Sequence, residues 1–215
     1  MVRHNIKNMN FRKIEKYYEV SLAKFKRGPN AVNWKDKKTQ ELRFKKLCEV
    51  GNLKNKKVLD VGCGLGEFYN YLKKKKIKCK YLGLDISQKM IDSIPTNNRN
   101  KNFKVEKINI LELSQRELKI LQCDFVISSG IFTVKSSYNN KFWWKHIQKM
   151  ILAMYKLTKI GMVFNLMKPN VNYKDNHLYY QSIDQLITFL EKKVSKKIIL
   201  KFDYPLWEFM CYVYK

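Results

Sequence analysis

The stretch Val58–Gly66, which reads VLDVGCGLG, is the part of the sequence that decides the fold. The run Lys57–Val61 is short, apolar and rich in valine, which is typical of a buried strand. Three glycines follow at positions 62, 64 and 66, and glycine permits the positive φ angles that tight turns require. The stretch therefore predicts a strand, a glycine loop and a helix over 67–76.

The spacing of these glycines differs from that of two common phosphate-binding loops. A dinucleotide fingerprint, G-x-G-x-x-G, would need its third glycine where this chain has Glu67. A Walker loop is excluded because no G-K-[ST] follows. Asp60 ends the strand, and a carboxylate there would repel a pyrophosphate but attract an ammonium or sulfonium group. Asp85 ends the next predicted strand, where it can accept both ribose hydroxyls of a nucleoside.

Strand and helix patterns alternate through most of the remaining chain. Further strands are predicted at 79–85, 102–105, 124–129 and 161–167, helices at 87–94, 141–157 and 182–193, and a terminal hairpin at 198–203 and 207–214. Five strand–helix units and a hairpin imply an α/β fold with a doubly wound, mostly parallel sheet of seven strands and an antiparallel edge strand. The first fifty residues are predicted to be helical, since apolar residues such as Phe11, Ile14 and Leu22 recur at helical spacing.

The composition favours one domain with a buried core, because 45% of the 215 residues are hydrophobic. The net charge of +26 makes nucleic acid an obvious partner. However, the lysines are spread along the whole chain, and AT-rich codons favour Lys, Asn and Ile, so a solvated surface is preferred. No apolar run approaches the roughly 20 residues needed to cross a bilayer, and no secretory signal is recognisable. We therefore expect a cytoplasmic protein, as a monomer or a homodimer.

The five cysteines are widely spaced and include no C-x-x-C pair. No cluster of cysteine and histidine has the spacing of metal ligands. We therefore expect reduced cysteines that serve in packing, and no metal site.

Four segments together resemble the class I S-adenosylmethionine-dependent methyltransferases: the glycine loop LDVGCGLG, the acid-ended strand YLGLDIS, the fourth strand DFVISSGIF and the terminal hairpin. The resemblance covers about residues 40–214, and AVNWKDKKTQELRF and DYPLWEFMCYVYK resemble a bacterial subgroup of unknown substrate. It implies a Rossmann-like methyltransferase domain over 51–215 with S-adenosylmethionine as cofactor. Residues 1–50 are expected to form a helical lid, because two short helices bury too little surface to fold alone.

The resemblance also implies which residues contact the cofactor. Asp60 would hold the methionine amino group, Asp85 the ribose, and Asn109 would accept a hydrogen bond from the adenine amino group. The full set implied comprises Asp60, Gly62, Cys63, Gly64, Asp85, Ile86, Met90, Asn109, Ile110, Ser128, Ser129, Trp34 and Arg43. Arg43 would pair with the carboxylate of the cofactor or of an acidic substrate.

Motifs for several classes of methyl acceptor are absent from the sequence. The fourth strand is followed by Ser129-Gly130-Ile131-Phe132 rather than [DNS]-P-P-[YFW], and no Pro-Cys dipeptide occurs. These absences favour transfer to O or N of a small molecule; the alternative is an RNA methyltransferase or an RNA-binding methyltransferase-like protein. Methyl transfer from a sulfonium is an in-line displacement, which mainly requires alignment of the reactants and exclusion of water. The candidate catalytic residues are Tyr17 and His146, with a packing role for His146 as the alternative.

Overall fold

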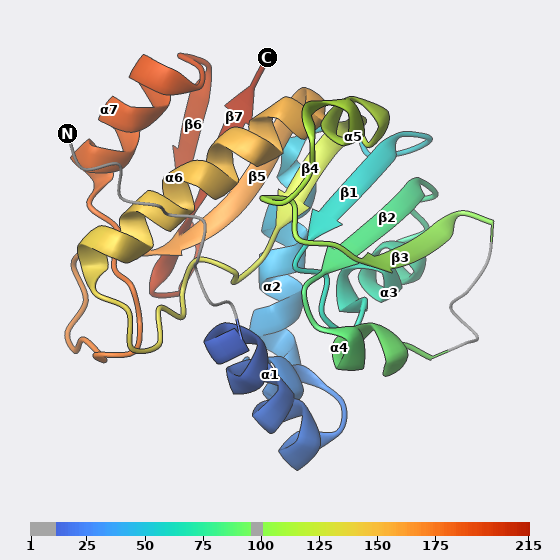
Figure 1. Cartoon of the computed structure of the whole chain (residues 1–215), viewed down its shortest axis with the longest axis horizontal. Coiled ribbons are helices and arrows are strands. Elements are labelled where there is room, and N and C mark those ends of the chain that lie inside the picture. The colour runs from blue at the N-terminus through green and yellow to red at the C-terminus, as the bar shows by residue number, and fades with distance from the viewer. Residues whose placement is uncertain (1–11, 96–100) are drawn as a thin grey trace.

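The computed structural model describes residues 12–95 and 101–215, so Phe11 lies outside the described residues. The helices are α1 (Arg12–Phe25), η2 (Pro29–Val32), α2 (Lys37–Leu47), η3 (Cys48–Val50), α3 (Glu67–Lys74), α4 (Gln88–Asp92), α5 (Gln115–Ile120), α6 (Asn140–Leu157) and α7 (Ile183–Lys193). The strands are β1 (Lys57–Val61), β2 (Lys80–Asp85), β3 (Phe103–Lys107), β4 (Cys123–Ser128), β5 (Thr158–Met167), β6 (Ile198–Lys201) and β7 (Glu208–Tyr214). Figure 1 shows their arrangement around one sheet.

The seven strands form a single sheet in the order β3-β2-β1-β4-β5-β7-β6. The first five strands along the chain are parallel, and β7 runs antiparallel to both β5 and β6. This confirms the predicted doubly wound, mostly parallel sheet. One detail differs: the antiparallel strand lies between β5 and β6 rather than at the edge. In this position β7 is buried along nearly its whole length, whereas β6, at the edge, is only partly buried.

Helices cover both faces of the sheet and create two apolar cores. On one face, α2 and α3 pack on the strands through Phe44, Leu47 and Leu72. On the other face, α6 and α7 pack through residues such as Trp143 and Leu190. Figure 1 shows α6 in front of the sheet and α2 behind it. The order of strands reverses between β1 and β4, and ligands of such sheets bind at the strand carboxyl ends beside that reversal.

Local signals in the sequence account for most helix boundaries. The side chain of Ser87 accepts a hydrogen bond from the Met90 N–H and caps α4, and Ser182 caps α7 in the same way. Helix α5 was not predicted, because its six residues are too few for a clear apolar period. A capping box formed by Ser114 and Glu117 was the available signal.

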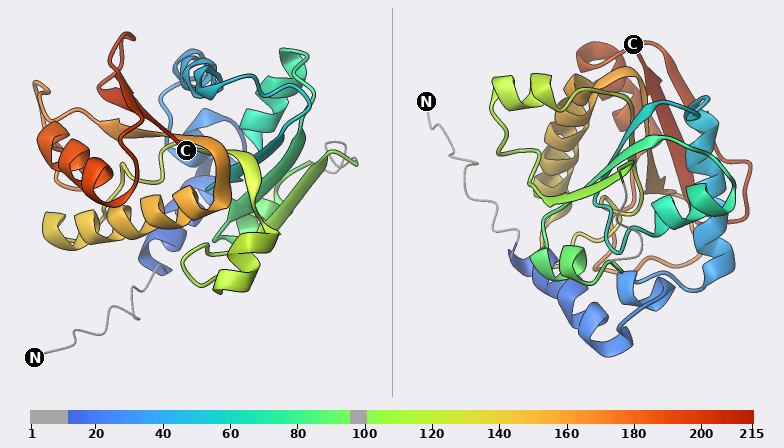
Figure 2. Two further views of the ribbon diagram at one scale, coloured as in Figure 1. Left: turned by 90° about the horizontal axis from the view of Figure 1, so that it is seen from above. Right: turned by 90° about the vertical axis from the view of Figure 1, so that its right-hand side faces the viewer.

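The N-terminal segment divides into two parts. Helix α2 belongs to the layer behind the sheet, where the fully buried Leu47 lies in the core. Helix α1 instead packs against η2 and α4, and Figure 2 shows α1 beside α4 at one end of the sheet. Two contacts from Glu19 fix this placement: an ion pair with Lys89 at 2.8 Å and a hydrogen bond from the Ser87 hydroxyl at 3.0 Å.

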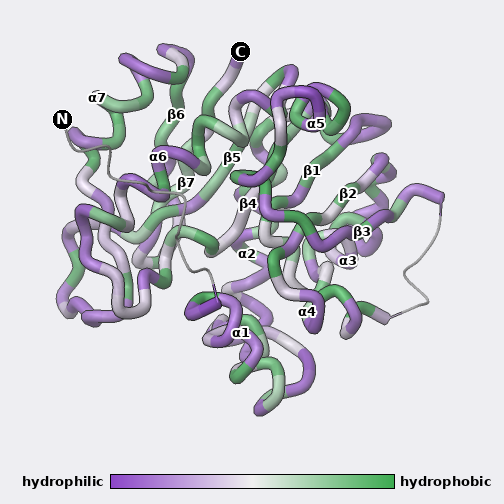
Figure 3. The backbone as a smooth tube through the Cα atoms, viewed as in Figure 1, coloured by the Kyte–Doolittle hydropathy of each residue, from purple (hydrophilic) through white to green (hydrophobic). Residues whose placement is uncertain are grey.

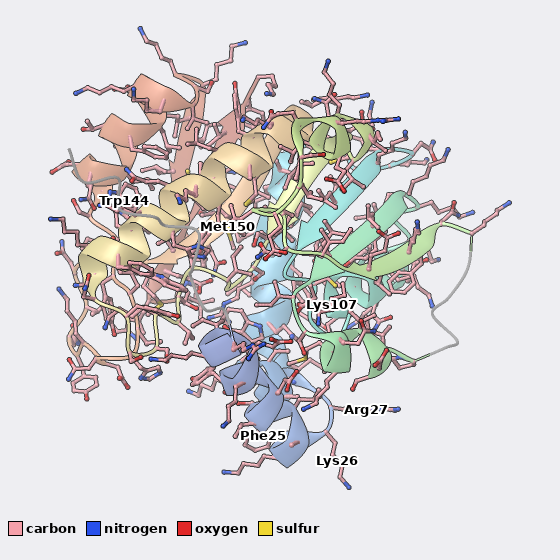
Figure 4. All side chains as sticks on the ribbon, viewed as in Figure 1. Phe25, Lys26, Arg27, Lys107, Trp144 and Met150 are labelled. Atoms are coloured by element: carbon pink, nitrogen blue, oxygen red, sulfur yellow. The ribbon has the colours of Figure 1, made fainter. Side chains whose placement is uncertain are left out.

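The basic side chains surround the molecule instead of gathering on one face. Nitrogen-tipped side chains project outward around the outline, including Lys26 and Arg27 at the end of α1 (Figure 4). The hydropathy colouring shows mainly hydrophobic residues along β5 and many hydrophilic residues in α1 (Figure 3). Among the helices of the described ranges, none combines the length and apolarity that a membrane span needs.

Candidate active site at the strand carboxyl ends

A cavity lies where β1, β2 and β4 end, under α1 and η2. Of the residues implied by the sequence, those that line it are Trp34, Asp60, Gly62, Cys63, Gly64, Asp85, Ile86, Met90, Asn109, Ile110, Ser129 and His146. These residues come from segments more than a hundred positions apart in the chain. The parallel sheet brings them together because the carboxyl ends of its strands share one edge.

The glycine loop is held by its own backbone. The N–H groups of Gly62 and Cys63 both donate to the carbonyl of Leu84 at the end of β2. Gly62 has φ +76°, and a Cβ atom there would lie 2.2 Å from Cγ2 of Ile131. The space next to Gly62 is therefore already filled by Ile131, so this glycine serves close packing of the loop against the segment after β4 as well as the turn itself.

Asp60 is a buried carboxylate with a tyrosine as its hydrogen-bond donor. The hydroxyl of Tyr81 donates to Oδ2 of Asp60 at 2.6 Å. Gly83 is the register partner of Asp60, and a Cβ atom there would lie 2.8 Å from Sγ of Cys63 and 3.1 Å from the Tyr81 ring, so a side chain at this position would crowd both. Burial raises the pKa of Asp60 to about 7, and the nearby charge of Asp85 adds to the rise while the bond from Tyr81 opposes it.

Asp85 joins the glycine loop to the start of α4. Its Oδ2 accepts from the N–H of Gly64 and its Oδ1 from the N–H of Ser87, both at 2.9 Å. Burial raises the pKa of Asp85, and these backbone donors oppose the rise. The geometry thus preorganises a carboxylate at the end of β2, where the sequence places a ribose-binding acid.

The two carboxylates give the cavity an excess of negative charge. Glu15 and Glu67 also line it, and no Lys or Arg appears in the lining among the described residues. Neither Asp60 nor Asp85 forms an ion pair within the described parts of the chain. Buried carboxylates are costly without a partner cation. A cationic ligand would relieve that cost, which fits an ammonium or sulfonium group.

The side of the cavity next to β3 is mainly apolar. Ile86 and Met90 line it together with Ile110, and Met90 and Ile110 are each 2% exposed. Asn109 also lines it, but its amide oxygen accepts from the N–H of Leu111, and its amide nitrogen donates to Glu112. This turn holds Asn109 in place and leaves one lone pair of its oxygen for a ligand.

Three residues of the predicted set lie outside the lining. Ser128 is buried, and its hydroxyl donates to the carbonyl of Val61 at 2.8 Å, a bond that joins β4 to the neighbouring strand β1. Arg43 is not part of the lining and forms an ion pair with Glu208 at 2.9 Å. Tyr17 packs edge-on against Tyr18, which lines the cavity in its place. Successive residues of a helix differ by about 100° in direction, so only one of these two tyrosines faces the cavity.

His146 belongs to α6 and lines the wall of the cavity. It is 6% exposed and packs 4.9 Å from the ring of Trp143, measured between centroids. Burial, with the charge of Lys149, lowers the pKa of His146 to about 4. The imidazole is therefore uncharged at neutral pH and has one nitrogen that accepts a hydrogen bond.

Sequence reasoning missed several residues of the site. Tyr81 was unassigned, although a tyrosine in β2 on the same face as Asp60 in β1 was a usable signal. Trp143 and Met150 also line the cavity, and from the sequence they were assigned only to the long helix. Their place in amphipathic helices gave no signal that distinguished a cavity wall from a core.

Comparisons with known proteins agree with this architecture. The family model described as "Methyltransferase domain" matches residues 52–204. "Putative methyltransferase Rv1506c" of Mycobacterium tuberculosis is 26% identical over 161 residues, which cover 73% of this chain and 91% of that protein. The family match contains the glycine loop and strands β1 to β6.

Two solved structures share the fold at low sequence identity. A SAM-dependent methyltransferase from Archaeoglobus fulgidus has a TM-score of 0.61 and 17% identity, covering 93% of this chain and 100% of that one. Magnesium protoporphyrin IX methyltransferase from Synechocystis PCC 6803, with SAH bound, has a TM-score of 0.61 and 14% identity, covering 83% and 82%. Because the family model spans more than half of the residues, the chain belongs to the methyltransferase domain family, as a class I enzyme whose methyl donor is S-adenosylmethionine.

Proposed function

We propose that the protein transfers a methyl group to an oxygen or nitrogen atom of a small molecule. The observation that carries this proposal is the contrast between the surface and the cavity. The chain has a net charge of +26, yet the described lining contains four acids and neither Lys nor Arg. A nucleic-acid acceptor needs basic groups along its phosphate path, and a small neutral or cationic acceptor does not.

The residues of the cavity fit S-adenosylmethionine, which supplies an electrophilic methyl group on a sulfonium when bound. Asp60 offers a carboxylate for the amino group of the methionine part, and Asp85 offers one for the ribose hydroxyls. Ile86, Met90 and Ile110 offer an apolar surface for the adenine, and the oxygen of Asn109 offers an acceptor for its amino group. The two buried carboxylates without a cation partner provide the charge complement.

The acceptor would lie beyond the cofactor, between α1 and α6. Ile14, Val134 and Met150 line this part with Trp143 and His146, so the surface is largely apolar. Enclosure by these residues excludes water, and alignment of acceptor and donor supplies most of the rate enhancement for a displacement of this kind. The structurally similar enzyme from Synechocystis, named for magnesium protoporphyrin IX, likewise methylates a small molecule.

His146 would orient the acceptor and not serve as a strong base. A general base works best when its pKa is near the operating pH, and the pKa of His146 is about 4. Its neutral imidazole can still accept a hydrogen bond from an O–H or N–H group of the acceptor. The packing role predicted as the alternative coexists with this one, since the ring also contacts Trp143.

Helix α1 with η2 would act as a lid over the cofactor. Ile14, Tyr18 and Val32 line the cavity from this segment. Deletion of residues 1–30 is expected to leave a folded core that binds S-adenosylhomocysteine weakly and shows little turnover. Hydrogen exchange in α1 should slow when S-adenosylhomocysteine is added to the full chain. Equal exchange in both states, with full activity of the shortened chain, would make α1 a structural appendage.

The acceptor class is tested by following a labelled methyl group. S-adenosylmethionine labelled in its methyl group is incubated with the protein and with either a small-metabolite extract or total RNA. We expect label in the small-molecule fraction, at a rate that changes less than twofold between low and moderate salt. The Asp85→Asn variant serves as the inactive control. Label in RNA, with a steep loss at higher salt, would refute the proposal.

A further inference from the structure

A ring of contacts joins two residues of the cavity wall to three buried residues outside it. The N–H of Gly130 donates to Oδ1 of Asn165 at 2.7 Å, and Nδ2 of Asn165 donates to Oε2 of Glu208 at 3.0 Å. Oε1 of Glu208 lies 2.9 Å from Nε of Arg43. The Arg43 guanidinium lies 3.9 Å from the centroid of the Trp34 ring.

Trp34 closes this ring of contacts, because it lies directly on Gly130. A Cβ atom at Gly130 would be 2.7 Å from Cζ2 of Trp34, so only glycine allows the approach. Gly130 has φ +85°, which also favours glycine. Both residues line the cavity where β4 ends, whereas Arg43, Asn165 and Glu208 do not. The ring therefore connects α2, β5 and β7 to one wall of the active site.

The buried charges in this ring contribute little net stability. Asn165 and Glu208 are each 1% exposed, and the side chain of Arg43 is 11% exposed. The Arg43–Glu208 contact is electrostatic and poorly aligned, since neither Nε nor Oε1 has a hydrogen bond of good geometry. A buried ion pair is commonly no more stabilising than apolar residues of the same size. The main effect of the Arg43–Glu208 pair is to fix the positions of Gly130 and Trp34.

We propose that Glu208 is a positioning residue for the active site. One carboxylate oxygen acts through Asn165 on the Gly130 backbone, and the other acts through Arg43 on the Trp34 ring. Glu208 thereby holds Trp34 and Gly130 together as a preformed wall at the end of β4. This inference rests on the assignment of the cavity as the methyltransferase site and not on the class of acceptor.

The test uses S-adenosylhomocysteine as the probe and no acceptor, so it is independent of the acceptor proposal. Each protein is labelled with 5-fluorotryptophan, and the signal of Trp34 among the four tryptophans is assigned with Trp34→Phe. Glu208→Gln removes the charge that faces Arg43. Arg43→Lys keeps the positive charge but loses the planar stack on Trp34. If Glu208→Gln does not fold, the same measurements are made on Arg43→Lys.

The matched control is Asp203→Asn. Asp203 pairs with Lys46 of α2 at 2.7 Å, so its loss removes another ion pair between α2 and the β6–β7 segment, away from the cavity. We expect Arg43→Lys and Glu208→Gln to weaken S-adenosylhomocysteine binding about tenfold and to shift the Trp34 fluorine signal. Asp203→Asn should change neither. A lowered melting temperature with binding within twofold of wild type, or with an unchanged Trp34 signal, would overturn the proposal.

Discussion

Cofactor binding should weaken as the pH falls below 7, because Asp60 must be ionised to attract a cationic ligand. Burial raises the pKa of this carboxyl group from its ordinary value of 3.8 to about 7 in the free protein. The ammonium group of S-adenosylhomocysteine favours the ionised carboxylate, so binding releases the proton that Asp60 holds at lower pH. His146, with a pKa of about 4, stays neutral over this range and does not contribute.

The size of the effect follows from the ionised fraction of Asp60. With a pKa of about 7, roughly 90% of the carboxyl groups are ionised at pH 8 and roughly 1% at pH 5. The affinity should therefore fall roughly 90-fold between these values, which corresponds to about 2.7 kcal/mol. As the pH falls below 7, the affinity should approach a tenfold loss per pH unit, as expected when binding releases one proton.

Calorimetry with S-adenosylhomocysteine at a series of pH values measures this dependence. Asp60→Asn keeps an oxygen that can accept from the Tyr81 hydroxyl, so it tests the charge alone. It should bind weakly and show no pH dependence between 5 and 8. Tyr81→Phe removes the donor that lowers the pKa of Asp60, so the midpoint should move to higher pH. A flat wild-type profile, or an Asp60→Asn profile parallel to it, would refute the reasoning.

Three further predictions concern Asp60, Asp85 and Gly62. The pKa of Asp60 is raised in the folded state, so its contribution to stability is fully present below pH 3.8 and is lost as the pH rises through 7. At pH 8, Asp60→Asn should therefore be more stable than wild type by up to roughly 4 kcal/mol in chemical denaturation. Equal stability of the two proteins would contradict this. Asp85→Asn should weaken S-adenosylhomocysteine binding tenfold or more, since hydrogen bonds to a charged group contribute about 1.5–3 kcal/mol, and unchanged binding in calorimetry would remove Asp85 from the site. Gly62→Ala should lower stability by roughly 2 kcal/mol or more, because strain at positive φ adds to the clash with Ile131. Gly28→Ala is its control, since Gly28 has φ +84° with nothing within 4 Å, and an equal loss in both variants would show that the clash contributes nothing.

The strand ends of the site were predictable because they depend on local patterns. The glycine loop and Asp60 follow one apolar run, and Asp85 follows the next, so the parallel sheet places them at one edge. The order of the last two strands was less accessible. It depends on which of these two strands pairs with β5, a long-range pairing rather than a local signal.

Contacts between distant segments were not accessible from the sequence. Arg43 lies in a stretch that resembles the methyltransferase subgroup, and this suggested a direct contact with a carboxylate ligand. In the structure Arg43 forms an ion pair with Glu208, which lies 165 positions further along the chain. The Asp60–Tyr81 bond likewise joins side chains of two neighbouring strands. Such pairings follow from packing in three dimensions, and the periodicity of a single sequence does not predict them.

The distribution of charge, more than its amount, decides what the cavity can bind. A chain with 44 basic residues would by its composition attract polyanions at any exposed face. The described cavity wall nevertheless contains Glu15, Asp60, Glu67 and Asp85 and neither Lys nor Arg, and the nearby Arg43 is already paired with Glu208. The surface lysines are solvated and screened within about 10 Å at moderate salt, whereas the buried carboxylates are screened much less. A cationic ligand inside the cavity therefore interacts mainly with the acids, and the positive surface has little influence on its affinity.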